Sequence, residues 1–148
     1  MTTYAREPYA AVIDEIKPLL HEHWQEIATY QDIPLDPDYP AYEMAEQHGR
    51  LRIFTARRDG VLVGYGVLFV GNLHYKSSRI ATQDILFVLP EHRLGRVGFG
   101  LVRFLDAQLK AEGVQVVYQH VKLAHPALGR VLSHVGYEPV ETIYARRF

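Results

Sequence analysis

A strand that leads directly into a helix, through a loop rich in glycine and arginine, constrains the fold of this chain more than any other feature. The apolar run Ile85–Leu89 ends at Pro90, and apolar residues recur at helical spacing from Leu101 to Leu109, before Gly113. Between them lies the sequence His92-Arg93-Leu94-Gly95-Arg96-Val97-Gly98-Phe99-Gly100. A helix that follows a strand so closely must pack back onto the sheet, which favours a layered α/β structure.

The remaining pattern predicts further strands and helices on both sides of this unit. Leu51–Ala56 and Val61–Val70 flank Asp59-Gly60, which is the residue pair that a tight β-hairpin favours. An apolar stripe over residues 13–27 predicts a helix, which Pro18 either kinks or divides in two. We also expect a helix at 41–47, a strand at 114–121, a helix at 126–135, and extended segments at 137–140 and 143–147.

This order of elements predicts a mixed sheet with helices on it, in an α/β three-layer arrangement. The length of 148 residues suits a single domain spanning 1–148. With 48% hydrophobic and 22% charged residues, the chain has enough apolar material for a buried core.

The composition also excludes several classes of protein. The absence of cysteine excludes disulfide scaffolds, thiolate zinc sites and a cysteine nucleophile. The longest apolar stretch, Val61–Gly71, is too short to cross a bilayer, and no secretory signal is visible at the N-terminus. We therefore expect a cytoplasmic protein without membrane contact.

The net charge argues against binding of nucleic acid, and the spacing of the histidines argues against a metal site. The net charge is −1 and the arginines are scattered, whereas phosphate contacts normally need a basic patch. His21 and His23 stand two residues apart, a spacing that points them in different directions on a helix. No His-Glu-x-x-His signature is present, so we predict no metal site.

The loop between the strand at 85–89 and its helix has the features of an anion site. The first N–H groups of a helix have no internal partners and lie at the positive end of its dipole. Glycines allow a phosphate to approach the backbone, and Arg93 or Arg96 can add charged hydrogen bonds. The sequence lacks the Gly-Lys-Ser/Thr of a P-loop, and Arg103 replaces the third glycine of a dinucleotide fingerprint. The alternative is a glycine-rich turn with surface arginines.

At this loop the sequence resembles the GNAT superfamily of N-acetyltransferases. The stretch Val-x-Pro-Glu-x-Arg, the glycine loop and the helix are similar to motif A, Arg/Gln-x-x-Gly-x-Gly/Ala, with Arg93 as its first residue and Gly98 as its last. Arg96 stands where glycine is usual, and this variant resembles phage-associated members. The resemblance covers roughly residues 50–145 and includes Gly136-Tyr137 in place of the family's Gly-Phe/Tyr.

The resemblance implies a GNAT fold, with a mixed, mostly antiparallel sheet and helices on both faces. It implies acyl transfer from acetyl-CoA to an amine, with the pyrophosphate on the N–H groups of residues 94–99 and the pantetheine along the strand edge at 86–88. The residues expected to contact acetyl-CoA are Leu86, Phe87, Val88, Arg93, Leu94, Gly95, Arg96, Val97, Gly98 and Phe99.

One carboxylate stands out as a candidate general base. Strict alternation places Thr82, Asp84, Leu86 and Val88 on one face of their strand, where several members of the family, by the resemblance, carry such a group. Asp84 is the only titratable residue of the four, and it can accept a proton directly or through water. The alternative is an aspartate that is merely exposed or ion-paired.

The position at which the family carries the acid for the CoA thiolate departs from the family pattern in this chain. The family's Asn-x-x-Ala-x-x-x-Tyr-x-x-x-Gly-Phe, counted back from Gly136, places His125 at the asparagine and Leu132 at the tyrosine. Leucine cannot donate a proton, so another group or water must serve. His125 and Ser133 are our catalytic candidates here, and the other groups considered are His134, Tyr118 and His120.

The acceptor pocket is expected from the N-terminal helices and the loop that joins them. Acidic and aromatic side chains of this region could attract a cationic amine by charge and by cation–π contact, namely Tyr30, Asp36, Asp38, Tyr39 and Tyr42. His74 could line the same pocket. The alternative is a solvated, proline-rich loop.

We therefore predict an acetyl-CoA-dependent N-acetyltransferase that acts by direct transfer on the primary amine of a small molecule or peptide. The alternatives are acyl-CoA-dependent modification of a nucleic-acid base and a non-catalytic domain that senses acyl-CoA. A homodimer is compatible with the sequence.

Overall fold

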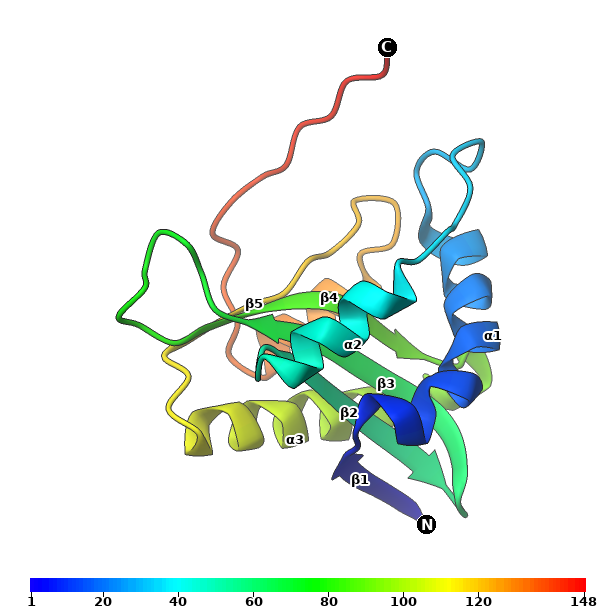
Figure 1. The fold of residues 1–148 in the computed structure, drawn as a ribbon. Helices are drawn as coiled ribbons and strands as arrows, with labels where there is room; N and C mark the ends of the chain where they lie inside the picture. Colours follow the sequence, from blue (N-terminus) through cyan, green and yellow to red (C-terminus); the bar gives the residue numbers. More distant parts are fainter.

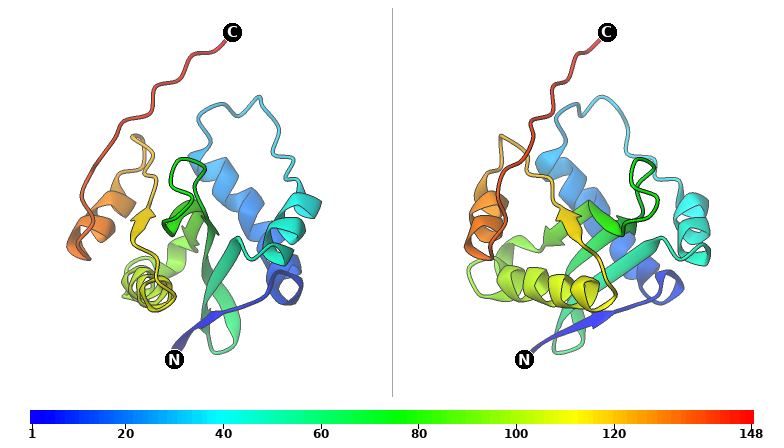
Figure 2. Two further views of the ribbon diagram at one scale, coloured as in Figure 1. Left: turned by 60° about the vertical axis from the view of Figure 1, so that its left-hand side comes forward. Right: turned by 90° about the vertical axis from the view of Figure 1, so that its left-hand side faces the viewer.

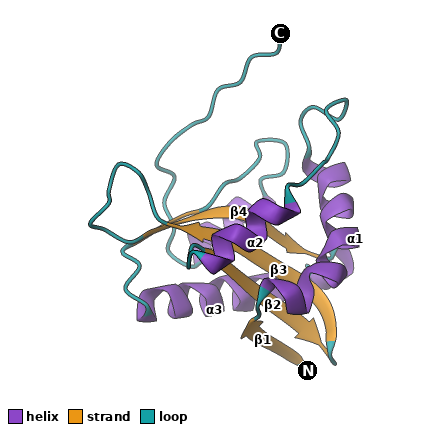
Figure 3. Ribbon diagram, viewed as in Figure 1, coloured by secondary structure: helices purple, strands orange, loops and turns teal.

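The computed structural model describes all 148 residues around one five-stranded sheet with the strand order β1-β2-β3-β4-β5 (Figures 1 and 3). Neighbouring strands are antiparallel except β4 and β5, which are parallel. In chain order the elements are β1 (Thr2–Arg6), α1 (Tyr9–Ile27), α2 (Tyr39–Gln47), β2 (Leu51–Arg58), β3 (Val61–Val70), β4 (Ile80–Val88), a 3₁₀ turn (Pro90–His92), α3 (Val97–Ala111), β5 (Val116–Tyr118) and α4 (Ala127–His134).

The helices cover both faces of the sheet, and each face has its own core (Figure 2). On one face α3 and α4 contribute Leu105 and Leu132, which pack with Phe54 of β2. On the other face Ile16 of α1 packs with Phe87 of β4. The mixed, mostly antiparallel sheet with helices on both faces is therefore confirmed. None of the helices is both long and apolar enough to span a membrane.

The β2–β3 hairpin forms where the sequence predicts it. Asp59 and Gly60 both have positive φ, at 50° and 85°, as a two-residue hairpin turn of the primed kind requires. Local residue chemistry is sufficient to specify this turn.

Of the two outcomes expected at Pro18, a kinked helix or two separate helices, the second does not occur, because α1 continues as one helix through Pro18. An internal proline costs about 3 kcal/mol through the lost hydrogen bond and the clash with the preceding turn. Val12 and Ile16 are buried before Pro18, and Leu20 packs against the same core after it. Continuous burial of one face outweighs the local cost.

Strands β4 and β5 separate soon after they meet. They pair only from Ile80↔Val116 to Thr82↔Tyr118, so β5 is shorter than the predicted strand at 114–121. Beyond that point the side chain of Gln83 intervenes, and its Oε1 accepts the N–H of His120 at 2.6 Å. The edge of β4 from Asp84 to Val88 therefore has no strand beside it on the β5 side.

The end of the chain differs from the prediction. Residues 137–140 and 143–147 are expected to be extended segments, with a last strand in this region, but no strand follows α4. From Glu138 on, the backbone makes no hydrogen bond with other backbone groups, and the tail runs away from the body of the protein (Figures 1 and 2). A sequence with strand propensity needs a neighbouring strand to become one.

Candidate functional site

A β-bulge in β4 determines where Asp84 points. Val67 pairs with Ile85 and Leu68 pairs with Gln83, so Asp84 is the extra residue between them. Leu86 then packs in the core beneath α3, whereas the Asp84 carboxylate is on the α2 side. The expectation that Asp84 shares a face with Leu86 and Val88 is therefore wrong, because the bulge interrupts the alternation and re-aims the side chain.

Asp84 and Tyr42, predicted for different roles, form one pair. The Tyr42 hydroxyl donates to Asp84 Oδ2 at 2.5 Å, and its ring lies against Phe69 at 5.7 Å between centroids. Burial, together with the hydrogen bond to Asp84, raises the pKa of Tyr42 well above its usual value. Tyr42 therefore remains a proton donor, while Asp84 is exposed and keeps Oδ1 without a protein partner.

The surface next to Tyr42 and Asp84 is aromatic and apolar. A narrow hollow between α1 and the sheet is lined by Tyr39, Tyr42 and Ile85 among others. The ammonium group of Lys17 lies 4.7 Å from the centre of the Tyr39 ring, so this ring already contacts a cation. Beneath them Tyr65 is fully buried and its hydroxyl has no partner, and burial raises its pKa.

The loop before α3 presents a row of free backbone donors. The six N–H groups from Leu94 to Phe99 make no hydrogen bond to any protein acceptor. No side chain caps α3, and no acidic residue lies in its first turn. Space is open in front of Gly95 and Gly98, where an added Cβ would meet no atom within 4 Å. Helix N-termini of this kind bind anions, so the residues present fit a pyrophosphate.

Comparison with known proteins agrees with this geometry. A family model described as "Acetyltransferase (GNAT) family" matches residues 14–137. The chain belongs to the GNAT acetyltransferase family. No curated protein sequence gives a significant match.

Solved structures show the same fold at low sequence identity. Ribosomal-protein-alanine N-acetyltransferase from Brucella melitensis biovar Abortus 2308 superposes with a TM-score of 0.78 at 20% identity, over 100% of this chain and 98% of that one. An aminoglycoside acetyltransferase from an uncultured soil metagenomic sample gives 0.77 at 14%, over 99% and 95%. An aminoglycoside N-acetyltransferase in complex with CoA gives 0.75 at 18%, over 100% and 95%.

In this GNAT chain the Arg93 side chain is already occupied. Its guanidinium donates to both carboxylate oxygens of Glu26 at 2.9 Å and to the Val88 carbonyl at 2.8 Å. Arg93 thus ties the loop to α1, and its role as a phosphate ligand stays a prediction. Arg96 is exposed and makes no ion pair, so its charge is available to an anion at this loop.

The sequence analysis considers His23 together with His21 as a metal ligand, rejects that role, and does not connect His23 with the loop before α3. The ring of His23 lies 4.8 Å from that of Phe87, close to Glu26 and Arg93. Burial lowers the pKa of His23 to about 4, so the ring is neutral at pH 7. The apolar stripe of α1 contained the signal, since His23 lies three residues after Leu20 on the side that faces the sheet.

The α4 candidates do not meet Asp84. His125 and Ser133 are exposed, and His134 contacts the edge of Phe99. Leu132, at the family's tyrosine position, is only 5% exposed and belongs to the core beneath α3. The structure therefore places no acid at that position.

The structure does not bring all of the predicted acceptor residues together. Tyr39 and Tyr42 line the hollow beside Asp84, whereas Asp38 caps α2 by accepting the Ala41 N–H at 3.1 Å. Tyr30 lies under the guanidinium of Arg147, and His74 lies on the β3–β4 loop against Tyr75. Asp36 is exposed on the α1–α2 loop.

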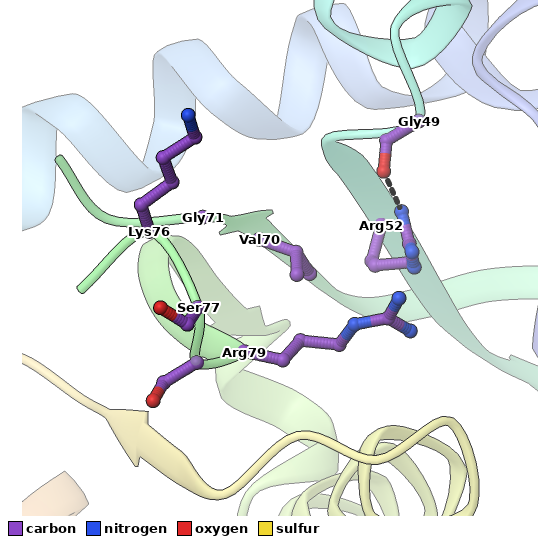
Figure 4. Close-up of a pocket in the computed structure, with 8 residues that line it drawn as sticks. Gly49, Arg52, Val70, Gly71, Lys76, Ser77 and Arg79 are labelled. Carbon is purple, nitrogen blue, oxygen red and sulfur yellow. Dashed lines mark hydrogen bonds between the residues drawn. The ribbon is translucent and has the colours of Figure 1, made fainter.

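A larger, polar hollow of about 330 Å³ lies at the other end of β4, next to Arg79, which precedes the strand (Figure 4). Figure 4 shows the side chains of Arg52 and Arg79 extending toward one another. Glu112 pairs with both, at 2.7 and 3.8 Å, so its carboxylate offsets one of these two positive charges within the protein. None of the predicted site residues lines this hollow, and no group of three or more metal-ligating side chains is assembled in the structure.

Proposed function

We propose that this protein transfers the acetyl group of acetyl-CoA directly to the primary amine of a cationic acceptor. The observation that carries the proposal is the arrangement along β4. The bulged Asp84 begins the free edge of the strand, and the loop with six free N–H groups follows its end.

Acetyl-CoA binding is assigned to this edge and this loop. The pyrophosphate accepts hydrogen bonds from the N–H groups of residues 94–99, with added charge from Arg96. The pantetheine amides pair with the backbone from Leu86 to Val88, where no neighbouring strand competes. This placement brings the thioester toward the bulge, on the side from which the acceptor enters.

Asp84 is the proposed general base. The Tyr42 hydroxyl holds Oδ2, which leaves Oδ1 to accept a proton from the acceptor ammonium directly or through one water. The free amine then attacks the thioester carbonyl, the new C–N bond forms, and the C–S bond breaks to release the CoA thiolate. The second proton, which the nitrogen loses during attack, passes to water because Asp84 already holds the first.

Protonation of the thiolate is the step for which the structure offers the fewest side chains. With a buried leucine at position 132, we assign protonation of the thiolate to water, and His125 and Ser133 remain predictions. The leucine at position 132 is also the one observation that favours a second candidate function, a domain that binds acyl-CoA without turnover.

The acceptor is proposed to be a cationic amine because its entry is lined by one carboxylate and by aromatic rings. Asp84 supplies charge, and the Tyr42 ring beside it supplies a π-face that stabilises an ammonium, while Lys17 already contacts the Tyr39 ring. Relatives of similar fold are named for acetylation of a ribosomal-protein alanine and of aminoglycosides, which are amine acceptors. Peptide or small-molecule acceptors, the phage-associated resemblance and a cytoplasmic location stay predictions.

The test is release of CoA thiol over a panel of amines, with Asp84→Asn as the variant and Asp14→Asn, at an exposed position of α1 outside the predicted site, as its matched control. We expect turnover of at least one cationic amine, which Asp84→Asn reduces much more than Asp14→Asn. Acetyl-CoA binding without turnover of any amine would favour the sensing domain. A salt-dependent shift with DNA or RNA would favour modification of a nucleic-acid base.

A further inference from the structure

The polar hollow of about 330 Å³ beside the start of β4 has no part in the proposed acyl transfer. It lies between the start of β2, the end of β3 and the β3–β4 loop, and Val70 is the only hydrophobic residue that lines it (Figure 4). Two glycines of its wall, Gly49 and Gly71, keep it open, since an added Cβ at either would meet no atom within 4 Å. A hollow of this size has room for a small molecule.

Positive charge exceeds negative charge around this hollow. Arg52, Lys76 and Arg79 line it, and no acidic residue does. Glu112, which follows α3, pairs with Arg52 at 2.7 Å and lies 3.8 Å from Arg79, so it offsets one of the three charges. Lys76 is exposed and forms no ion pair. Two positive charges therefore remain for an anion.

Arg52 is the rigid member of the three cations. Its side chain is only 9% exposed. Its Nε and Nη2 donate to the Glu112 carboxylate, and its Nη1 donates to the carbonyls of Gly49 and Leu51. A guanidinium has five N–H groups, so one N–H of Nη2 has no acceptor in the protein. A buried charged donor without a partner is unfavourable, and an anion in the hollow would supply the missing acceptor.

The β3–β4 loop adds further donors that the protein does not use. Arg79 donates from Nη1 to the carbonyl of Glu112 at 2.7 Å, and the rest of its guanidinium donates to no protein atom. The backbone N–H groups of Lys76 and Ser77 are also without a protein acceptor. Figure 4 shows the Arg79 side chain crossing toward Arg52, with Lys76 at the other rim of the hollow. Donors from two distant segments of the chain thus surround one open space.

We propose that this hollow binds a phosphate dianion, at a site separate from the acetyl-CoA loop before α3. A phosphate monoester carries a charge of about −2 at pH 7, which matches the two positive charges that Glu112 leaves. Its oxygens can accept from both arginines and from Lys76 at once, whereas a carboxylate has one charge and two oxygens. The volume also leaves room for the rest of a small phosphate monoester. This inference stands independently of the acyl-transfer chemistry.

The first experiment locates the binding by NMR of the ¹⁵N-labelled full chain without acetyl-CoA. The ligands are inorganic phosphate and phenyl phosphate, with benzoate as the carboxylate control. Both phosphates are expected to shift the amide signals of residues 76–79, and benzoate is expected to bind at least roughly tenfold more weakly. Tighter binding of phenyl phosphate identifies a monoester as the ligand, and equal binding of the two phosphates identifies free phosphate. No shift in residues 76–79, or benzoate that binds as tightly as phosphate, would overturn the proposal.

The second experiment connects this signal with the two exposed cations. Lys76→Gln combined with Arg79→Gln removes both charges and is expected to weaken phosphate binding roughly 100-fold. The matched control Arg103→Gln, at an exposed position of α3, is expected to bind as the original does. Arg96→Gln, at the acetyl-CoA loop, is also expected to keep the shifts at residues 76–79, because the two sites are separate.

A third variant, Ser77→Asp, places a carboxylate at the hollow on an exposed residue and is expected to weaken phosphate binding by repulsion. Thermal melts verify that each variant is folded, and phosphate is expected to raise the Tm of the original protein more than that of the double variant. Folded Lys76→Gln/Arg79→Gln and Ser77→Asp proteins that bind phosphate as tightly as the original would overturn the proposal.

Discussion

Gly98→Asp is a substitution that tests acetyl-CoA binding separately from folding. Gly98 is the second residue of α3, its N–H is free, and an added side chain meets open space. A carboxylate in the first turn of a helix is stabilised by the helix dipole by about 0.3–1 kcal/mol, so the variant should fold at least as well as the original. The same carboxylate places a negative charge where the pyrophosphate is assigned.

The expected loss follows from the hydrogen bonds removed. Each bond from a backbone N–H to a charged phosphate contributes about 1.5–3 kcal/mol, so losing two costs about 3–6 kcal/mol. Because about 1.4 kcal/mol is a factor of ten, acetyl-CoA affinity should fall roughly 10²–10⁴-fold. Isothermal titration measures the affinity, and a thermal melt measures the folding.

Gln108→Glu is the matched control, since it adds the same charge on an exposed position near the other end of α3. Its acetyl-CoA affinity should be unchanged. A folded Gly98→Asp protein that binds acetyl-CoA as tightly as the original would refute the assignment of the pyrophosphate to this loop.

Three further predictions concern the acceptor side and α1. Tyr42→Phe removes the hydrogen bond to Asp84 and should lower kcat/KM about 10- to 100-fold, with acetyl-CoA affinity unchanged. A variant with the same kcat/KM as the original protein would exclude a role for this hydrogen bond in catalysis. The double substitution Asp36→Asn and Asp38→Asn should raise KM for a cationic amine and reduce the salt sensitivity of KM, while asparagine at position 38 still caps α2. An unchanged KM at low ionic strength would show that this loop is solvated and does not attract the acceptor. The pKa of His23 is lowered to about 4 in the folded protein, so as pH falls the unfolded chain takes up a proton at this residue before the folded chain does, and the free energy of unfolding should decline between about pH 6.5 and 4. Urea unfolding should show a smaller decline over this range for His23→Phe. An identical decline in the two proteins would contradict burial of a neutral ring.

The parts of the fold that sequence predicts are those that depend on neighbouring residues. The positive φ angles at Asp59-Gly60 need only the preferences of aspartate and glycine. The free N–H groups before α3 follow from where the helix begins, which the glycines and the apolar spacing indicate.

The parts that sequence does not predict depend on contacts between distant segments. The bulge at Asp84 exists only in the register of β4 against β3, so alternation along β4 alone gives the wrong face. Arg93 is paired with Glu26 of α1, and Tyr42 with Asp84, across 67 and 42 residues of chain. Pro18 lies within a continuous helix because α1 packs on the sheet, and the C-terminal segment is no strand because no strand lies beside it.

The most direct test of the central claim is the dependence of kcat on pH for the original protein and for Asp84→Asn. Asparagine keeps the size of the side chain and can still accept the Tyr42 hydrogen bond, but it cannot take up the proton of the acceptor. If Asp84 is the base, kcat falls roughly 10²–10⁴-fold, the acidic limb of the profile disappears, and acetyl-CoA affinity is unchanged. If the acidic limb survives in Asp84→Asn and kcat stays within a few-fold of the original, Asp84 is not the base and the proposed mechanism is wrong.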